Sequence, residues 1–310
     1  MRRPPTDLLD PDRISANLET KRIGKKILVY DSTSSTQTIA AEYAKYKDND
    51  GLVVFAEEQT TGRGRAGNKW YSERSDSILC SIILTQSTLN AELLSLTCAV
   101  AVAETIGKPA KNQAKIKWPN DILVSGRKVA GILLESKQTT WDGLSARDTR
   151  PQRVAASKPK ALGMVEPGKT IPKLRLRLPP IEPQENVNGI YIIGIGINCH
   201  QRKDSFPEEL QSIATSMDIE ARSVTDRISL AKRLLISIDD WLEAVQTNAQ
   251  KVTDRWRELS IQLGHRIALV FNGRKFTGHC IGVDPEKGLM LQLDTGGVRM
   301  FDAAHTTIAK

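Results

Sequence analysis

Residues 59–70 carry the side chains best suited to chemistry, reading Gln-Thr-Thr-Gly-Arg-Gly-Arg-Ala-Gly-Asn-Lys-Trp. Three glycines within six positions let the backbone come close to a ligand. Arg63 and Arg65 each offer a planar cation that can bind two oxygens of a phosphate or carboxylate. The segment is either an anion-binding loop or a solvated turn between apolar strands expected at 52–56 and 78–84.

A second group of polar residues follows a buried helix expected at 93–106. Residues 117–121 read Lys-Trp-Pro-Asn-Asp. They predict a turn between two short strands, because proline cannot pair inside a central ladder and Asn and Asp favour turns. Lys128 opens the next strand, where a lysine after a turn is ordinarily solvated, so its spacing alone gives it no role.

Glycines recur inside two apolar strands, at 128–135 and 189–198. Gly131 lies in the first, and Gly194 and Gly196 alternate in the second. A glycine inside a strand often marks a close approach to the backbone. Two strands cleared of side chains on one face predict a sheet floor under a ligand.

The remaining segments supply the scaffold. A short helix is expected at 12–20 and a strand at 26–30. Hydroxyl groups at 31–36 can cap the helix that follows or bind a polar ligand at its N-terminus. A long amphipathic helix is expected at 225–250. Short β-rich runs separated by turns at 264–310 predict a small β-barrel.

One segment departs from this pattern. Residues 137–187 hold seven of the fourteen prolines, ten Lys or Arg and five Asp or Glu, so +5 of the net charge of +8 lies there. With few aliphatic residues it cannot bury enough surface to offset its ordering entropy. We predict a disordered insert. The rest of the chain is near neutral, which argues against a nucleic-acid-binding face.

Composition excludes several other classes. The chain is 40% hydrophobic and 26% charged, as expected for a soluble globular protein. Its apolar runs are shorter than the roughly 18 residues a membrane span needs, and we expect a cytoplasmic protein. The scattered cysteines predict buried thiols rather than disulfides or a zinc site; they are Cys80, Cys98, Cys199 and Cys280.

Taken in order, these motifs resemble the biotin protein ligase family. The matching segments are Asp31-Ser32-Thr33, Gln59, GRGRAGNKW at 62–70, KWPND at 117–121, KVAGILLE at 128–135, GIGIN at 194–198 and the small C-terminal barrel. The resemblance implies an α+β fold, with a mixed sheet backed by helices and followed by an SH3-like barrel. It implies an N-terminal tail at 1–26, a catalytic domain at 27–260 and the barrel at 261–310.

The resemblance also implies a two-step reaction. Biotin would react with ATP and Mg²⁺ to give biotinyl-5′-AMP and pyrophosphate. A lysine of a biotin carboxyl carrier protein would then take the biotin and release AMP. The carrier and the two small molecules are the implied partners, without DNA or a membrane, and the enzyme would be a monomer or weak homodimer.

The family's site residues carry over to matching positions. Lys128, Arg63 and Arg65 would be catalytic, with Lys128 bridging the biotin carboxylate and the α-phosphate. The implied biotin site comprises Ser32, Thr33, Gln59, Gly62, Arg63, Gly64, Arg65, Lys128, Gly131, Gly194 and Gly196. The implied nucleotide site comprises Arg65, Trp70, Asn120, Asp121, Lys128 and Asn198, with Asp121 a candidate Mg²⁺ ligand. Thr36 and Gln37 depart from the family, which often has Asn at the helix start.

Three alternatives remain. A lipoate or octanoyl ligase shares the general fold and the acyl-adenylate logic, but it would lack the paired GRGRAG and KWPND motifs. A DNA-binding biotin repressor would need an N-terminal winged helix-turn-helix, and only some 26 residues precede the catalytic region. A pure binding protein would not release pyrophosphate from ATP.

Overall fold

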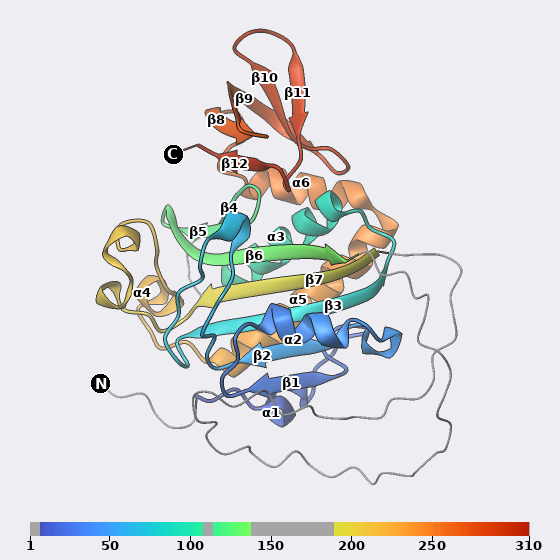
Figure 1. Cartoon of the computed structure of the whole chain (residues 1–310), viewed down its shortest axis with the longest axis vertical. Coiled ribbons are helices and arrows are strands. Elements are labelled where there is room, and N and C mark those ends of the chain that lie inside the picture. The colour runs from blue at the N-terminus through green and yellow to red at the C-terminus, as the bar shows by residue number, and fades with distance from the viewer. Residues whose placement is uncertain (1–6, 108–113, 138–188, 310) are drawn as a thin grey trace. The chain divides into compact units, whose positions relative to one another are not determined.

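The computed structural model describes residues 7–107, 114–137 and 189–309, and its largest element is a seven-stranded mixed sheet (Figure 1). The strand order is β1-β2-β3-β7-β6-β5-β4. β1 and β2 run parallel, and the other neighbouring pairs are antiparallel. The strands are β1 (Ile27–Tyr30), β2 (Val53–Ala56), β3 (Ser77–Ser87), β4 (Lys115–Lys117), β5 (Asp121–Val124), β6 (Arg127–Lys137) and β7 (Gly189–Asn198).

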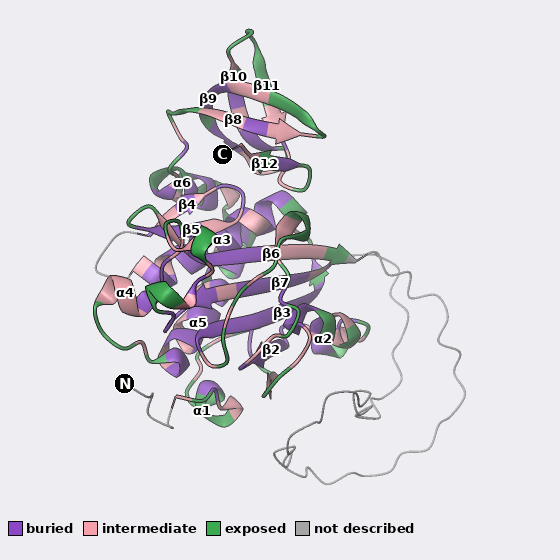
Figure 2. Cartoon of the chain, turned by 60° about the vertical axis from the view of Figure 1, so that its left-hand side comes forward, coloured by how far each residue is buried: buried purple, intermediate pink, exposed green. Residues whose placement is uncertain are grey.

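The core lies at the middle of this sheet, because helices cover both of its faces. α2 packs on one face, and α3 and α5 pack on the other (Figure 1). β2 is buried throughout and β3 is exposed at one position, as Figure 2 shows. Strands covered on both sides require near-continuous apolar runs, which is the pattern read from the sequence. The helices are α1 (Pro11–Ser15), α2 (Thr36–Tyr43), α3 (Ala91–Gly107), α4 (Met217–Ala221), α5 (Arg227–Thr247) and α6 (Ala249–Leu259), with short 3₁₀ turns η1 (Lys47–Asn49), η2 (Arg65–Gly67), η3 (Lys203–Ser205) and η4 (Glu208–Leu210).

The long helix expected at 225–250 is wrong at its C-terminal end. α5 stops at Thr247, Asn248 has an extended conformation (φ −155°, ψ 91°), and α6 starts at Ala249. The break redirects the chain, so that Val252 and Trp256 of α6 become buried and α6 packs against α3. The buried helix predicted at 93–106 is confirmed as α3.

The N-terminal segment, expected as a tail, packs against α5 and β1 of the main fold from residue 7 onward. Ile14 and Ile23 are fully buried. Asp7 lies between a histidine and an arginine: its carboxylate is 2.7 Å from His200 Nε2 and 3.0 Å from Arg227 Nε. Arg227 is itself fully buried. This segment is polar in composition, yet it is held in place by buried contacts with the rest of the fold.

A second, antiparallel sheet follows α6, with the order β11-β10-β9-β8-β12. Gly288 starts β10 with φ +84°, and a Cβ there would lie 2.2 Å from the carbonyl oxygen of Phe301. The expected SH3-like architecture is consistent with this sheet, but over residues 266–308 it stays open, since β11 and β12 are its two edges. Its strands are β8 (Arg266–Phe271), β9 (Arg274–Asp284), β10 (Gly288–Leu293), β11 (Val298–Phe301) and β12 (Thr306–Ile308).

The disordered insert predicted at 137–187 lies outside the described residues, apart from Lys137 at the end of β6. Within the parts of the chain that are described, no helix is long and apolar enough to cross a membrane.

Candidate active site

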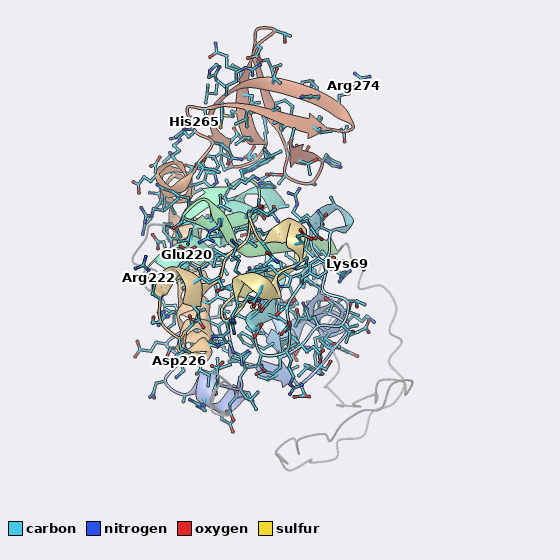
Figure 3. The ribbon with its side chains drawn as sticks, turned by 90° about the vertical axis from the view of Figure 1, so that its left-hand side faces the viewer. Lys69, Glu220, Arg222, Asp226, His265 and Arg274 are labelled. Atoms are coloured by element: carbon cyan, nitrogen blue, oxygen red, sulfur yellow. The ribbon has the colours of Figure 1, made fainter. Side chains whose placement is uncertain are left out.

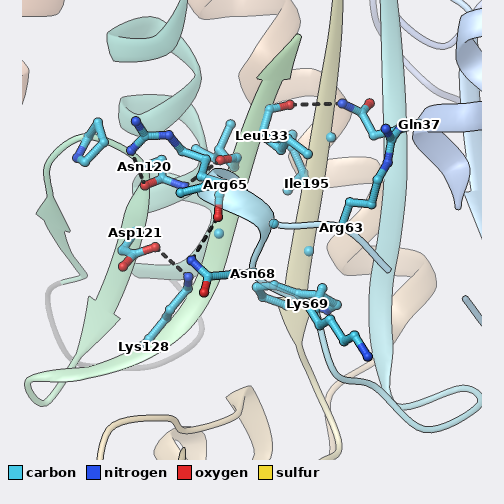
Figure 4. A pocket seen from close by; sticks show the side chains of 18 of the residues that line it. Gln37, Arg63, Arg65, Asn68, Lys69, Asn120, Asp121, Lys128, Leu133 and Ile195 are labelled. Atoms are coloured by element: carbon cyan, nitrogen blue, oxygen red, sulfur yellow. Dashed lines mark hydrogen bonds and ion pairs between the residues drawn. The ribbon is translucent and has the colours of Figure 1, made fainter. Parts of the chain in front are cut away.

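A cavity of about 330 Å³ opens above the sheet, where the glycine-rich loop faces β6 and β7 (Figure 4). The loop at 63–70 lines one side, and the turn at 117–121 lines another. Thr307 and Ile308, from β12 of the second sheet, complete its rim. The structure thus brings together the two motifs that the sequence analysis singled out.

The glycine floor of the cavity is present and carries an indole ring. Gly131 and Gly196 pair directly across β6 and β7. A Cβ on Gly196 would lie 2.5 Å from Trp70 Cε2, and one on Gly131 would lie 3.0 Å from Trp70 Cζ3. The glycines are therefore required for the Trp70 ring to pack this close to the sheet. Gly194 gives similar room to Gln37, whose Cδ would be 3.0 Å from a Cβ there.

One end of the cavity is neutral and built from a chain of hydrogen bonds. Thr36 donates to Gln59 Oε1 from both its backbone N–H, at 2.8 Å, and its hydroxyl, at 3.0 Å. Ser81 donates to the Thr36 hydroxyl at 2.8 Å. Ser35 Oγ and Gln37 Oε1 are buried and have no hydrogen-bond partner among the described residues. Unpaired buried polar atoms are costly, so this end is suited to a neutral polar group that pairs with them.

Cys80 of β3 lies in the sheet beneath the cavity. It pairs with Ile195, between the pairs that contain Gly194 and Gly196, so its thiol points to the opposite face of the sheet and into the hydrophobic core. Burial there raises the pKa of the thiol to about 12.

The two residues predicted at this end, Ser32 and Thr33, lie outside the cavity lining. Ser32 is exposed, and the backbone N–H of Thr33 donates to the carbonyl oxygen of Glu58 at 3.1 Å. The next Ser-Thr pair along the chain, Ser35-Thr36, lines the cavity instead. Ser35 is the N-cap residue directly before α2, and the sequence alone shows only that hydroxyl groups cluster at this helix start.

The other end of the cavity is charged, and Lys128 there is already paired. Lys128 Nζ lies 2.5 Å from Asp121 Oδ1 and 5.6 Å from the centre of the Trp70 ring. This pair is partly exposed, so it is weak enough to exchange for a stronger anion. Arg63 lies away from Lys128, beside Gln37 (Figure 4), and its Nη1 is 3.4 Å from Glu135 Oε1.

Arg65 joins three parts of the site. Its guanidinium donates to Asn120 Oδ1 at 3.3 Å, to the carbonyl oxygen of Thr306 at 3.2 Å, and to that of Ala303. Burial lowers the pKa of Arg65, and the nearby carboxylate of Asp121 opposes that shift. The glycine loop, the 117–121 turn and the second sheet therefore meet at one side chain.

Two other predicted contacts lie outside the lining. Asn198 is buried, and its Nδ2 donates to the carbonyl oxygen of Thr215 at 3.0 Å. Gly62 is where the loop folds back, since a Cβ would lie 2.7 Å from the carbonyl oxygen of Trp70. Both support the site from outside the cavity. The remaining predicted residues line it: Gln59, Arg63, Gly64, Arg65, Trp70, Asn120, Asp121, Lys128, Gly131, Gly194 and Gly196.

The donor set for a metal ion is small. Within the described ranges, no group of three or more His, Cys, Asp or Glu side chains could hold one. Asp121 and Asn120 both line the cavity with oxygen donors. Mg²⁺ in nucleotide sites commonly takes one or two carboxylates and completes its shell with phosphate and water. The residues present fit that mode.

Known proteins resemble this chain in sequence and in fold. The model of the Biotin/lipoate A/B protein ligase family matches residues 29–142. The bifunctional ligase/repressor BirA of Bacillus spizizenii is 30% identical over 299 residues, covering 95% of this chain and 78% of that protein. The biotin–[acetyl-CoA-carboxylase] ligase of Mycobacterium tuberculosis is 26% identical over 310 residues, covering 94% and 93%. The biotin protein ligase of Aquifex aeolicus, in complex with biotin and ATP, has a TM-score of 0.66 at 22% identity, covering 92% of this chain and 99% of that chain.

A mixed sheet followed by a small antiparallel sheet is the fold shared with the Aquifex aeolicus ligase. The chain belongs to the biotin protein ligase family.

Proposed function

We propose that this protein is an ATP-dependent biotin–[acetyl-CoA-carboxylase] ligase. The observation that carries the proposal is one cavity with two chemically different ends, a neutral hydrogen-bonding end at Thr36 and Gln59 and a cationic end at Lys128 and Arg65. Biotin has the same two ends, since a neutral ureido ring is joined by an aliphatic chain to a carboxylate. Trp70 lies between the two ends, over the floor that the aliphatic chain would cross.

The neutral end would bind the ureido ring. Ser35 Oγ and Gln37 Oε1 are the buried atoms with free hydrogen-bonding capacity, and Gln59 is held in place by Thr36. A ring with two N–H donors and one carbonyl acceptor can satisfy these atoms. A site that leaves polar groups unpaired without its substrate discriminates strongly against analogues that lack the matching groups.

The charged end would carry out adenylation. The biotin carboxylate attacks the α-phosphorus of ATP, the bond from that phosphorus to the bridging oxygen breaks, and pyrophosphate leaves. Two anions must approach, so preorganised cations lower the barrier by stabilising charge in the transition state. Lys128 would exchange Asp121 for the substrate's oxygens. Mg²⁺, held by Asp121 and the phosphates, would neutralise further phosphate charge.

Transfer would follow in the same cavity. The ε-amine of a carrier lysine attacks the acyl carbon of biotinyl-AMP, the bond to the phosphate oxygen breaks, AMP leaves and the nitrogen loses a proton. Arg65 tethers the glycine loop to the second sheet, which would shield the mixed anhydride from water until the carrier arrives. The biotin carboxyl carrier domain is the proposed partner.

Biotin-dependent exchange of labelled pyrophosphate into ATP tests the first step. Incorporation of biotin into a purified carrier domain tests the second. Lipoate and octanoate serve as competing substrates, because the family model spans both kinds of ligase. Exchange stimulated by lipoate but not biotin would replace the proposal with a lipoate ligase, and absence of any exchange would leave a binding protein.

A further inference from the structure

The main chain of Lys128 is held by a distant segment. Its N–H donates to the carbonyl oxygen of Ile213 at 2.8 Å, and its carbonyl oxygen accepts the N–H of Thr215 at 2.9 Å. Residues 213–215 thereby form a short parallel bridge alongside Lys128. The ladder between β5 and β6 shifts register between Ile122 and Leu123, directly beside this position. A bulge changes the direction of nearby side chains and weakens the local ladder. The direction of the Lys128 side chain therefore depends on the added bridge to residues 213–215.

One buried carboxylate fastens that bridge to the turn preceding Lys128. Glu220 lies on α4 (Figure 3), and its side chain is 5% exposed. It accepts hydrogen bonds from Ser125 Oγ at 2.8 Å, in the turn after β5, and from Arg127 Nη2 at 2.7 Å, at the first residue of β6. It also accepts from Thr215 Oγ1 at 2.7 Å. A single carboxylate therefore joins the two stretches of chain on either side of the lysine.

The surrounding structure holds Glu220 in turn. Ser216 caps the start of α4 and donates its hydroxyl to the carbonyl oxygen of Gln201 at 2.7 Å. Asn198, at the end of β7, donates to the carbonyl oxygen of Thr215. Thr215 and Ser216 are both fully buried. Because charge-assisted hydrogen bonds are short and strong, three of them on a buried carboxylate fix their partners closely.

We propose that Glu220 is a positioning residue for Lys128, keeping the ammonium at the point where carboxylate and α-phosphate meet. It does not line the cavity and touches no substrate. The inference rests on the proposed function, since it gives Lys128 the adenylation role. The competing view is that Glu220 only stabilises α4 and the turn. The two differ in one respect: positioning acts through the Lys128 ammonium, and stability does not.

The primary test is single-turnover formation of biotinyl-AMP by Glu220→Ala and Glu220→Gln in the full chain. Misplacement of a catalytic group by about 1 Å can cost on the order of 10²-fold. We expect the adenylation rate of Glu220→Ala to fall about 10- to 30-fold, with the biotin KM within about threefold, because the neutral end is untouched. Glu220→Gln keeps one acceptor oxygen for Arg127 and Thr215, so it should recover most of the rate.

A double-mutant cycle with Lys128→Gln separates positioning from stability. Once the ammonium is gone, its placement no longer matters, and adding Glu220→Ala should slow the reaction by less than about twofold. Glu209→Ala is the matched control, because Glu209 is an exposed carboxylate on the same segment and should react as the wild type does. Thermal melts accompany every variant.

If Glu220→Ala does not fold, Arg127→Gln removes one donor of the same carboxylate and should lower the rate in the same direction. An equal loss in the Lys128→Gln background, or wild-type rates in both Glu220 variants, would overturn the inference while leaving the ligase intact. A wild-type enzyme without biotin-dependent pyrophosphate exchange would overturn the proposed function itself, and the inference with it.

Discussion

The two ends of the cavity are prepared for ligand in opposite ways. At the neutral end, Thr36 and Gln59 are fixed by hydrogen bonds, and buried oxygens nearby have bonding capacity left over. At the charged end, Lys128 has a full ion pair with Asp121. Ligand at the first end adds bonds, whereas ligand at the second must replace them. The first end should therefore determine binding, and the second should act mainly through rate.

The largest effect is expected at the charged end, from Lys128→Gln. This change keeps side-chain length and some hydrogen bonding but removes the charge. Loss of one preorganised donor typically costs on the order of 10²-fold or more in rate. We expect that loss in single-turnover adenylation, with biotin affinity and the melting temperature near wild type. A rate within about threefold of wild type, roughly 0.7 kcal/mol, would show that Lys128 is a solvated strand residue without a catalytic role.

At the neutral end, Thr36→Val should weaken biotin binding and leave the adenylation rate nearly unchanged. It preserves shape while removing the hydroxyl that donates to Gln59 and accepts from Ser81. Leaving such partners unpaired costs about 1–3 kcal/mol, so biotin affinity should weaken about 10- to 100-fold while the rate at saturation changes little. Thr33→Val is the matched control, because that hydroxyl lies outside the lining. Calorimetric titration with biotin measures the affinity of each variant. Equal losses of affinity in Thr36→Val and Thr33→Val would refute the assignment of Ser35-Thr36 to the biotin site.

Arg65→Ala should reduce retention of biotinyl-AMP more than it reduces biotin affinity. The guanidinium holds the glycine loop to the second sheet through Ala303 and Thr306. Without it the loop should open more often, and biotinyl-AMP should escape about tenfold faster, with a smaller effect on biotin binding. Release of adenylate from a preloaded enzyme, followed by biotinylation of bystander lysines, measures this. A collapse of biotin affinity without escaped adenylate would place Arg65 in the ground-state site.

The smallest effect is expected for His200 and its carboxylate partners, which stabilise the fold and do not line the cavity. Burial disfavours the charged form of His200, but hydrogen bonds to Asp218 and Asp7 outweigh it and leave its pKa above the ordinary value of 6.5. Its stabilising effect is thus complete below about pH 6.5 and is lost as pH rises through the raised folded-state pKa. The melting temperature should fall by a few degrees over that window. His200→Gln should flatten this dependence, whereas an unchanged slope would show that other groups titrate there.

Most of the scaffold was predictable because its signals are local. β7 spans 189–198 as its apolar run indicated, and α3 is buried as its even hydrophobicity required. The Ser-Thr register was not predictable, because 31–36 contains two such pairs and either can stand near a helix start. Choosing between them depends on which one faces β3, and that is set by packing across the sheet.

Long-range contacts account for the other differences. Asn248 ends α5 because α6 buries Trp256, a contact that the periodicity of α5 does not contain. The anchoring of Asp7 by Arg227 joins residues 220 positions apart, so the polar N-terminal stretch reads as a tail. The support of Lys128 by Glu220 is likewise invisible in sequence, because α4 is only five residues long.

The register of β3 has a consequence for the lifetime of the reaction intermediate. A mixed anhydride is an acylating agent, and a thiolate beside it would capture the biotinyl group as a thioester before the carrier lysine could. Cys80 pairs with Ile195, so its sulfur faces the hydrophobic core, and the sheet separates it from the glycine-cleared face. Burial there raises the pKa of the thiol to about 12, so only about one Cys80 side chain in 10⁵ is ionised at pH 7. A shift of β3 by one residue would bring the sulfur to the cavity face, so the strand register itself protects the intermediate from self-labelling.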